Sequence, residues 1–190
     1  MRIISGSAAS VILKVPKGFD VRPTPDLVRQ AVFNSLAARV VGARVLELFG
    51  GTGALSLECL SRGAAHAVCV ELAGRHARMI QENVANTGFA REQFELRVQD
   101  VFVALPQLAE GGRLFDLILA DPPYGEKNVN RRSESLAQQL LDDVTVVKIL
   151  APDGILVVGH TKRDTLSLPA HLTEFKVMKH GDTMMRFFRH

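Results

Sequence analysis

Cysteine is scarce in this sequence, and long apolar runs are absent. The two cysteines, Cys59 and Cys69, each lie in an apolar pattern, so a disulfide framework is excluded and reduced core thiols of a cytosolic protein are expected. No apolar run approaches the roughly 20 residues that span a bilayer. The start, Met1 to Gly6, lacks the apolar core and cleavage site of a signal peptide. We therefore expect a cytoplasmic protein with no membrane partner.

Repeats, low-complexity segments and linkers are also missing, as is any zinc-ligand spacing of histidine and cysteine. A chain of 190 residues with 47% hydrophobic residues predicts one domain without a metal, 1–190. Residues 1–40 form its N-terminal extension and residues 41–190 its core. Residues 1–35 and 160–190 each carry a charge balance of +3, whereas residues 36–159 carry −3. This pattern suits a core whose two ends touch a polyanion, although random scatter of surface charge gives the same balance.

Apolar runs alternate with segments of helical spacing along most of the chain. This alternation predicts parallel strands joined by right-handed crossovers, with helices on both faces of the sheet. After Pro169, two strand-like runs flank His180-Gly181-Asp182 and predict a hairpin with an antiparallel closing strand. The predicted fold class is α/β and Rossmann-like, with a mostly parallel seven-stranded sheet. Strands are expected at 43–49, 66–71, 94–99, 115–120, 155–159, 173–179 and 183–189, helices at 24–39, 54–62, 73–87, 101–109 and 133–150, and a strand pair or arm at 1–20.

A glycine-rich turn follows the first of these strands. Residues 50, 51 and 53 are glycines, which let the backbone turn sharply and approach a ligand closely. The spacing is not that of the dinucleotide fingerprint, because Leu55 and Ser56 stand where its third glycine would be. Glu47 precedes the turn, and a carboxylate suits a cation or an amine better than a pyrophosphate. The turn therefore favours S-adenosylmethionine over a nicotinamide dinucleotide.

Four successive strand ends carry an acid. Glu71 ends the second strand, where a carboxylate can accept from both ribose hydroxyls. Asp100 ends the third and can accept from the adenine amine, with Val101 or Phe102 packing on the ring. Each acid alone is more often a solvated strand end or a helix cap. Together with Glu47 and Asp121, they predict a nucleotide-like cofactor.

The fourth strand is followed by Asp121-Pro122-Pro123-Tyr124. The proline rings fix φ and remove two backbone donors, so the turn is stiff and its carbonyls point outward. A planar group bearing an amine fits there, because its ring can stack on Tyr124 while the amine donates to Asp121 and the Pro122 carbonyl. The alternative is an ordinary turn that ends a strand. His160, at the end of the fifth strand, is more often structural than catalytic.

With these residues placed, the chain resembles the class I S-adenosylmethionine-dependent methyltransferases, and more closely the RsmD family. The resemblance covers almost the whole chain. The glycine loop and the D-P-P-Y turn are shared by many amino-methyltransferases, whereas the R-P-T segment and the arm before it are specific to this family. The matching segments are Met1-Arg2-Ile3-Ile4-Ser5-Gly6, Arg22-Pro23-Thr24-Pro25-Asp26 with Arg29 and Phe33-Asn34, residues 47–55, Leu60-Ser61-Arg62-Gly63-Ala64, Glu71, Asn83, residues 121–124 and Gly181-Asp182-Thr183.

The resemblance implies methylation of a guanine N2 in 16S ribosomal RNA, at a 966-type site, during assembly of the 30S subunit and by a monomer. It implies a catalytic turn at Asp121, Pro122, Pro123 and Tyr124, and an N-terminal arm and helix that contact RNA. The base would have to leave its stack to reach this turn. RNA contacts are expected from Arg22, Thr24 and Arg29. Cofactor contacts are expected from Glu47, Phe49, Gly50, Gly51, Thr52, Gly53, Glu71, Leu72, Asp100, Val101 and Asp121.

The chain departs from the family pattern at a few positions. Glu47 and Gly50 replace the usual aspartate and alanine, and the arm at residues 7–13 lacks the usual lysines and arginines. A DNA adenine-N6 methyltransferase fits the same D-P-P-Y turn but usually carries an added target-recognition region. A nicotinamide-dependent oxidoreductase and an RNA-binding relative without catalysis are the alternatives from other classes.

Overall fold

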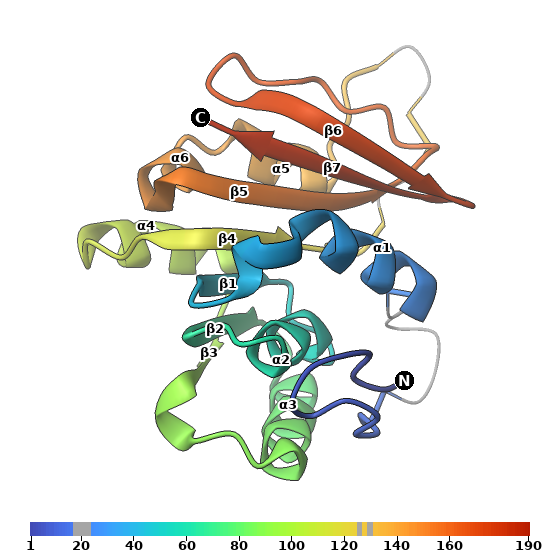
Figure 1. Ribbon diagram of the computed structural model, residues 1–190. Coiled ribbons are helices and arrows are strands. Elements are labelled where there is room, and N and C mark those ends of the chain that lie inside the picture. The colour runs from blue at the N-terminus through green and yellow to red at the C-terminus, as the bar shows by residue number, and fades with distance from the viewer. Residues whose placement is uncertain (17–23, 125–126, 129–130) are drawn as a thin grey trace.

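The computed structural model describes residues 1–16, 24–124, 127–128 and 131–190. Its centre is a seven-stranded sheet in the order β3-β2-β1-β4-β5-β7-β6 (Figure 1). Neighbouring strands from β3 to β5 are parallel, whereas β7 is antiparallel to both β5 and β6. The predicted fold class is thereby confirmed. The strands are β1 (Arg44–Leu48), β2 (His66–Glu71), β3 (Phe94–Val98), β4 (Phe115–Ala120), β5 (Leu150–Thr161), β6 (Thr173–His180) and β7 (Thr183–Arg189).

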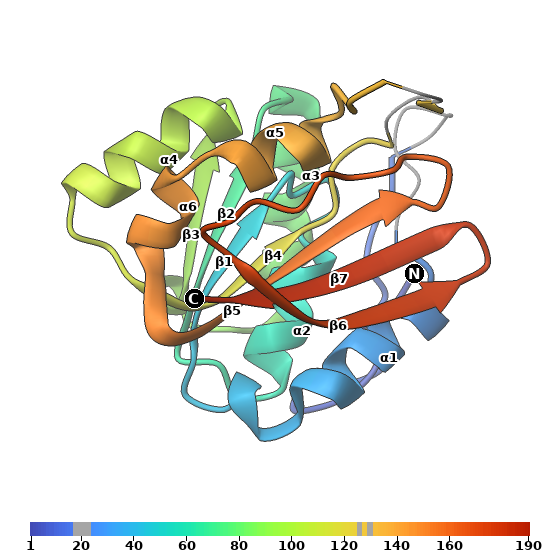
Figure 2. The ribbon, with the colours of Figure 1, turned by 90° about the horizontal axis from the view of Figure 1, so that it is seen from above.

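Helices cover both faces of the sheet (Figures 1 and 2). Successive side chains of a strand point to opposite faces, so Leu46 and Leu48 of β1 pack in one core cluster and Val45 in the other. The first cluster is covered by α4, α5 and α6, and the second by α1 and α2, with α3 beside α2. The helices are α1 (Asp26–Leu36), α2 (Ala54–Ser61), α3 (Gly74–Thr87), α4 (Val101–Glu110), α5 (Leu136–Asp142) and α6 (Thr145–Ile149), with 3-10 turns η1 (Ala37–Val40) and η2 (Arg91–Gln93).

The N-terminal arm folds back on α2. A single antiparallel bridge joins Arg2 to Ile12, and Ile3 and Leu13 are buried with Leu57 of α2 in a small third cluster. Residues 1–16 therefore form the expected arm rather than a regular strand pair.

The expected helix at 133–150 is two helices, and the strand after it begins earlier than predicted. Asp143 ends α5 and caps the next turn, because its side chain accepts from the backbone N–H of Thr145 at 2.8 Å. β5 then starts at Leu150 and contains Pro152 and Gly154, which were expected to lie between helix and strand. A register shift opposite Phe115 and Leu117 takes residues 151–154 out of the ladder, so the missing N–H of Pro152 breaks no bond there.

The strand order reverses between β1 and β4. The chain runs outward from β1 to β2 and β3 on one side, and from β4 to β5 on the other. In open parallel sheets this reversal opens a crevice at the carboxyl ends of the two central strands, where ligands bind. Among the described residues, no helix is long and apolar enough to cross a membrane.

Candidate active site

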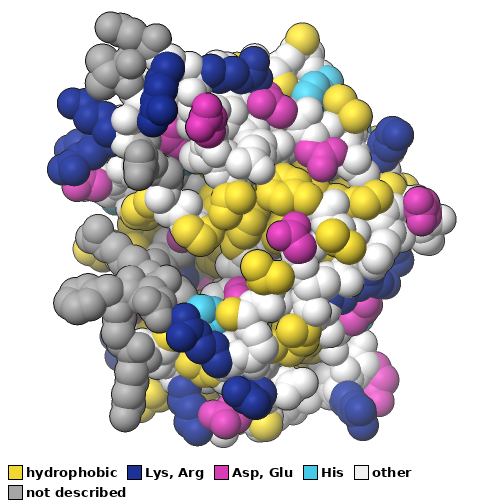
Figure 3. Space-filling model, turned by 180° about the vertical axis from the view of Figure 1, so that it is seen from behind, with side chains coloured by type: hydrophobic (Ala, Val, Ile, Leu, Met, Phe, Trp, Pro, Cys, Tyr) yellow, Lys and Arg dark blue, Asp and Glu magenta, His cyan; other side chains and the backbone are white. Residues whose placement is uncertain are grey.

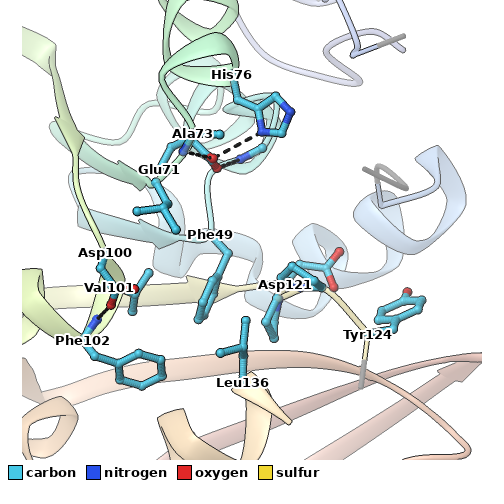
Figure 4. A pocket seen from close by; sticks show the side chains of 14 residues that line it. Phe49, Glu71, Ala73, His76, Asp100, Val101, Phe102, Asp121, Tyr124 and Leu136 are labelled. Carbon is cyan, nitrogen blue, oxygen red and sulfur yellow. Dashed lines mark hydrogen bonds and ion pairs between the residues drawn. The ribbon is translucent and has the colours of Figure 1, made fainter. Parts of the chain in front are cut away.

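A cavity of about 480 Å³ lies at this crevice, within the usual size range of small-molecule sites. Figure 4 shows Glu71 and His76 at one end, Asp121 and Tyr124 at another, and the Phe49 ring between them. The lining comes from the segments that follow four parallel strands. It consists of Phe49, Gly51, Glu71, Leu72, Ala73, His76, Asp100, Val101, Phe102, Asp121, Pro122, Pro123, Tyr124 and Leu136.

The turn after β1 has an unusual backbone. Phe49, Gly51 and Gly53 have φ of 61°, 55° and 73°, the left-handed region that a bulky residue such as Phe49 rarely adopts. This conformation turns the Phe49 ring into the cavity, where its centroid lies 6.4 Å from that of Phe102 in an edge-on arrangement. Gly50, Thr52 and Gly53, which were expected to contact the cofactor, do not line the cavity.

Gly50 fits tightly against the neighbouring strand. A Cβ at this position would lie 2.4 Å from Sγ of Cys69 in β2, closer than any real contact. Its backbone N–H donates to the Val70 carbonyl at 2.9 Å. Gly50 therefore lets the turn lie close to β2, and the alanine usual in the family would not fit beside the buried Cys69 thiol without a shift.

Glu47 does not reach the cavity, contrary to the expectation that it contacts the cofactor. Its carboxylate is buried and accepts from the backbone N–H groups of Leu55 at 3.2 Å and Ser56 at 2.9 Å. These are free donors in the first turn of α2, so Glu47 fixes the helix to β1. Burial raises the pKa of Glu47 to about 7, against the effect of the hydrogen bonds from Ser56.

Glu71 is held as the last residue of β2. One carboxylate oxygen accepts from the N–H of Gly51 at 2.7 Å, and the other from the N–H of Ala73 at 2.8 Å. The second oxygen also lies 3.3 Å from Nδ1 of His76. The carboxylate thus joins the glycine turn to the start of α3. Because each oxygen has two lone pairs, an acceptor site remains for a hydroxyl in the cavity.

Asp100 caps α4. Its side chain accepts from the N–H of Phe102 at 2.7 Å, which fixes Val101 and Phe102 at the cavity wall. The expected pair of an acid and an apolar face is therefore present at the end of β3. Leu72 is 66% exposed at the rim, far more than its neighbours in β2.

Asp121 follows β4, and its two carboxylate oxygens differ in their surroundings. One oxygen accepts from the Thr24 hydroxyl, and the other, Oδ1, is buried without a hydrogen-bond partner among the described residues. Burial raises its pKa to about 6, and the hydrogen bond from Thr24 acts the other way. Gly159 of β5 makes room for it, since a Cβ there would lie 2.3 Å from Oδ1. Asp121 is thus an acceptor with one unused oxygen.

The rest of the turn lies beside Asp121. Pro122 is buried, Pro123 is exposed, and both line the cavity. The Tyr124 hydroxyl lies 2.8 Å from Oγ1 of Thr183, the first residue of β7. The four residues of the predicted catalytic turn therefore share one cavity with Glu71 and Asp100.

The expected RNA contacts have different surroundings. Arg22 lies outside the described residues. Thr24 is buried and donates to Asp121, so it holds that carboxylate without itself lining the cavity. The Arg29 side chain is 0% exposed, which corrects the expectation that it contacts phosphate. Its guanidinium donates to the Arg2 carbonyl at 2.6 Å and lies 3.6 Å from the buried Glu58 carboxylate.

Glu58 explains why the arginine is inside. Its carboxylate also accepts from the N–H groups of Ile4 at 2.7 Å and Ser5 at 3.1 Å. Arg29 and Glu58 therefore fasten the N-terminal arm to α1 and α2. Arginine in a sequence motif looks the same whether it faces solvent or the core, so only packing separates the two roles.

Three residues of the cavity wall were missed: Ala73, His76 and Leu136. His76 lies in the first turn of α3, and its buried Nε2 has no partner among the described residues. The sequence signal that could have identified His76 as a cavity residue was its position five residues after Glu71. His160 is structural as expected, because Nδ1 lies 3.0 Å from the Asp164 carbonyl and Nε2 accepts from Arg186 at 2.9 Å.

Known proteins resemble this chain in both sequence and fold. Residues 1–189 match the family described as "Conserved hypothetical protein 95". The small-subunit ribosomal RNA methyltransferase D of Haemophilus influenzae is 28% identical over 100% of this chain and 93% of that protein. Its Escherichia coli counterpart is 36% identical over 65% of this chain and 60% of that protein. A solved hypothetical protein of Thermus thermophilus has 29% identity and a TM-score of 0.82, over 100% of this chain and 99% of that one.

The family match spans nearly the whole chain, and the cavity lies at the crevice where open α/β sheets bind their ligands. The chain belongs to the RsmD family and has the fold of the class I methyltransferases.

Proposed function

We propose that this protein transfers a methyl group from S-adenosylmethionine to the exocyclic N2 of a guanine in small-subunit ribosomal RNA. The observation that carries the proposal is Oδ1 of Asp121, a buried acceptor without a partner among the described residues, beside a proline-locked turn and Tyr124. An unused buried acceptor is costly unless a ligand supplies the donor. The amine of a guanine is such a donor.

The cavity fits S-adenosylmethionine. Phe49, Val101 and Phe102 offer apolar surface for the adenine ring, and Glu71 keeps an acceptor site for a ribose hydroxyl. The Gly51 backbone approaches closely, as a ligand of this size requires. When bound, the cofactor supplies an activated methyl group on a sulfonium. The carboxylates of the cavity suit that positive charge, whereas they would repel a pyrophosphate.

Asp121 orients and activates the amine. The lone pair of guanine N2 is delocalised into the ring, so the nitrogen is a poor nucleophile. Acceptors at Asp121 and the Pro122 carbonyl would hold its two hydrogens and favour the tetrahedral geometry of the methylated product. Positive charge grows on the nitrogen as the bond forms, and a fixed carboxylate stabilises it. Asp121 or water can then take the proton that the nitrogen loses.

Tyr124 supplies the stacking face for the base. Its hydroxyl is held by Thr183, which limits rotation of the ring. Stacking of a base on an aromatic ring is worth about 1–3 kcal/mol. The proposal includes residues 1–40 in the same functional unit, because the arm is fastened to α2 through Glu58 and Thr24 contacts Asp121.

The direct test is methyl transfer to ribosomal particles. Small subunits from a bacterium that lacks its own enzyme of this type are incubated with the protein and radiolabelled S-adenosylmethionine, and the modified nucleoside is identified by mass spectrometry. We expect N2-methylguanine in the 16S ribosomal RNA. Large subunits are the matched control. Label on an adenine N6, or on the large subunit alone, would contradict the proposed substrate.

A further inference from the structure

A second hollow, of about 1000 Å³, lies beside the catalytic turn and is lined mainly by cations. We call it the basic groove. Its lining contains six lysines and arginines and no acid, all six of them exposed. In Figure 3, lysine and arginine side chains gather at the upper left of the picture, next to the central hydrophobic band. The six cations are Lys127, Arg131, Arg132, Lys162, Arg163 and Lys179.

Specific side-chain hydrogen bonds hold the segments that form the basic groove. The Asn128 amide donates to the Thr165 carbonyl at 3.0 Å and accepts from the Thr165 N–H at 2.8 Å. The buried Gln138 of α5 does the same with Ser167, at 3.0 and 2.7 Å. Two side-chain amides thus fasten the loop after β5, one to the loop after the catalytic turn and the other to α5. The cations of both loops are thereby held on one surface.

The cations differ in how they are paired. Lys162 lies 2.6 Å from Asp182 and Arg132 lies 2.6 Å from Asp142. Lys127, Arg163 and Lys179 have no side-chain partner among the described residues. Like charges that gather without counter-charges repel one another, so such a groove gains most from an anion that spans it.

The groove is joined to the catalytic turn. The Tyr124 hydroxyl contacts Thr183, whose neighbour Asp182 pairs with Lys162 of the groove. Thr183 in turn lies opposite Thr161, the last residue of β5. A chain whose base stacks on Tyr124 would therefore extend its backbone into the groove within a few nucleotides.

We propose that the basic groove binds the phosphate backbone of the ribosomal RNA next to the target guanine. The inference rests on the proposed function and names the surface by which that site holds its substrate. It also replaces Arg29, which is buried, as the source of phosphate contacts. The groove reads no sequence, because exposed lysines and arginines contact phosphates irrespective of the base.

The test compares two double variants of equal charge. Arg163→Gln with Lys179→Gln removes two unpaired cations of the groove. The control, Arg91→Gln with Lys148→Gln, removes one arginine and one lysine that are exposed outside the groove. Binding of fluorescently labelled oligouridine is measured by anisotropy over a range of salt concentrations. Methyl transfer to small subunits and the affinity for S-adenosylhomocysteine are measured on the same samples.

The expected loss of RNA affinity in the groove variant follows from counterion release. Each phosphate contact on a single strand contributes about 0.7 to the slope of log affinity against log salt, so two lost contacts lower the slope by about 1.4. In about 0.1 M salt this makes binding about 25-fold weaker. The control variant should keep the slope of the wild type, and both variants should keep their affinity for S-adenosylhomocysteine.

The outcomes separate the two proposals. If the wild type methylates small subunits and both variants lose affinity equally, the groove is refuted while the proposed function stands. If the groove variant alone loses RNA affinity but the wild type methylates no ribosomal RNA, the function is refuted and the groove stands. If the wild type binds no RNA, both proposals fail.

Discussion

Replacing Asp121 by asparagine should abolish methyl transfer and at the same time stabilise the folded protein. The variant Asp121→Asn keeps the shape of the side chain and an oxygen that can accept from the Thr24 hydroxyl. It removes the ionisation of a buried carboxyl whose second oxygen has no partner among the described residues. The site therefore holds a charge that the fold disfavours and the proposed reaction needs.

The magnitude follows from the pKa of Asp121. Burial raises this pKa from 3.8 to about 6, so ionisation is harder in the folded state than in the unfolded state. The wild type keeps its full free energy of unfolding below pH 3.8, where Asp121 is protonated in both states. It loses part of this free energy as the pH rises from 3.8 through about 6. The loss amounts to about 3 kcal/mol at pH 8 and about 1.6 kcal/mol at pH 5. The asparagine variant has no such loss, so its advantage should grow by about 1.4 kcal/mol between these two pH values.

The assay is urea unfolding of both proteins at pH 5 and pH 8. Because only the change with pH is compared, any constant effect of the amide cancels. Asp116→Asn is the control: the hydrogen bond from Arg44 lowers the pKa of Asp116 below 3.8, so Asp116 is ionised in both states at pH 5 and pH 8, and the stability difference between this variant and the wild type should stay constant. A stability difference between wild type and Asp121→Asn that stays constant over this range would refute the reasoning. Methyl transfer by the wild type should fall as the pH drops through about 6, because protonated Asp121 lacks the negative charge that stabilises the positive charge growing on the amine nitrogen.

Three further substitutions test other parts of the structure. Glu71→Gln should weaken binding of S-adenosylhomocysteine about tenfold by calorimetry, since an amide cannot accept from both backbone N–H groups that the carboxylate holds; unchanged affinity would remove Glu71 from the cofactor site. Gly50→Ala should cost about 1–3 kcal/mol in urea unfolding, and a second change, Cys69→Ala, should restore most of it because Sγ is the atom in the way. Arg29→Met should lower the free energy of unfolding by about 3 kcal/mol because it leaves Glu58 with one cation fewer. The salt dependence of oligouridine binding should stay unchanged in this variant. A lower slope of log affinity against log salt would show that Arg29 contacts RNA.

The order of strands and helices could be predicted because each depends on local apolar patterns. The predicted β1, β2 and β4 agree with the structure to within about two residues. The break between α5 and α6 was missed because the apolar spacing continues across it while Asp143 caps a new turn. The start of β5 was missed because Pro152 and Gly154 are typical of a loop, and only the register shift against β4 accommodates them in a strand.

The roles of the four acids depend on where each stands relative to the end of its strand. Glu47 lies inside β1, one residue before Leu48, and its side chain points to the face covered by α2 rather than to the edge of the sheet. Glu71 is the last residue of β2, whereas Asp100 and Asp121 come after β3 and β4, and all three line the cavity. A side chain within a strand is committed to one face by the alternation of the backbone, and only at the last residue or beyond can it turn toward the crevice. Strand boundaries predicted from sequence are uncertain by a residue or two. That uncertainty is enough to mistake a residue that anchors a helix for one that contacts a ligand. The same reasoning expects the Glu47 carboxyl to affect the stability of α2 far more than the affinity for the cofactor.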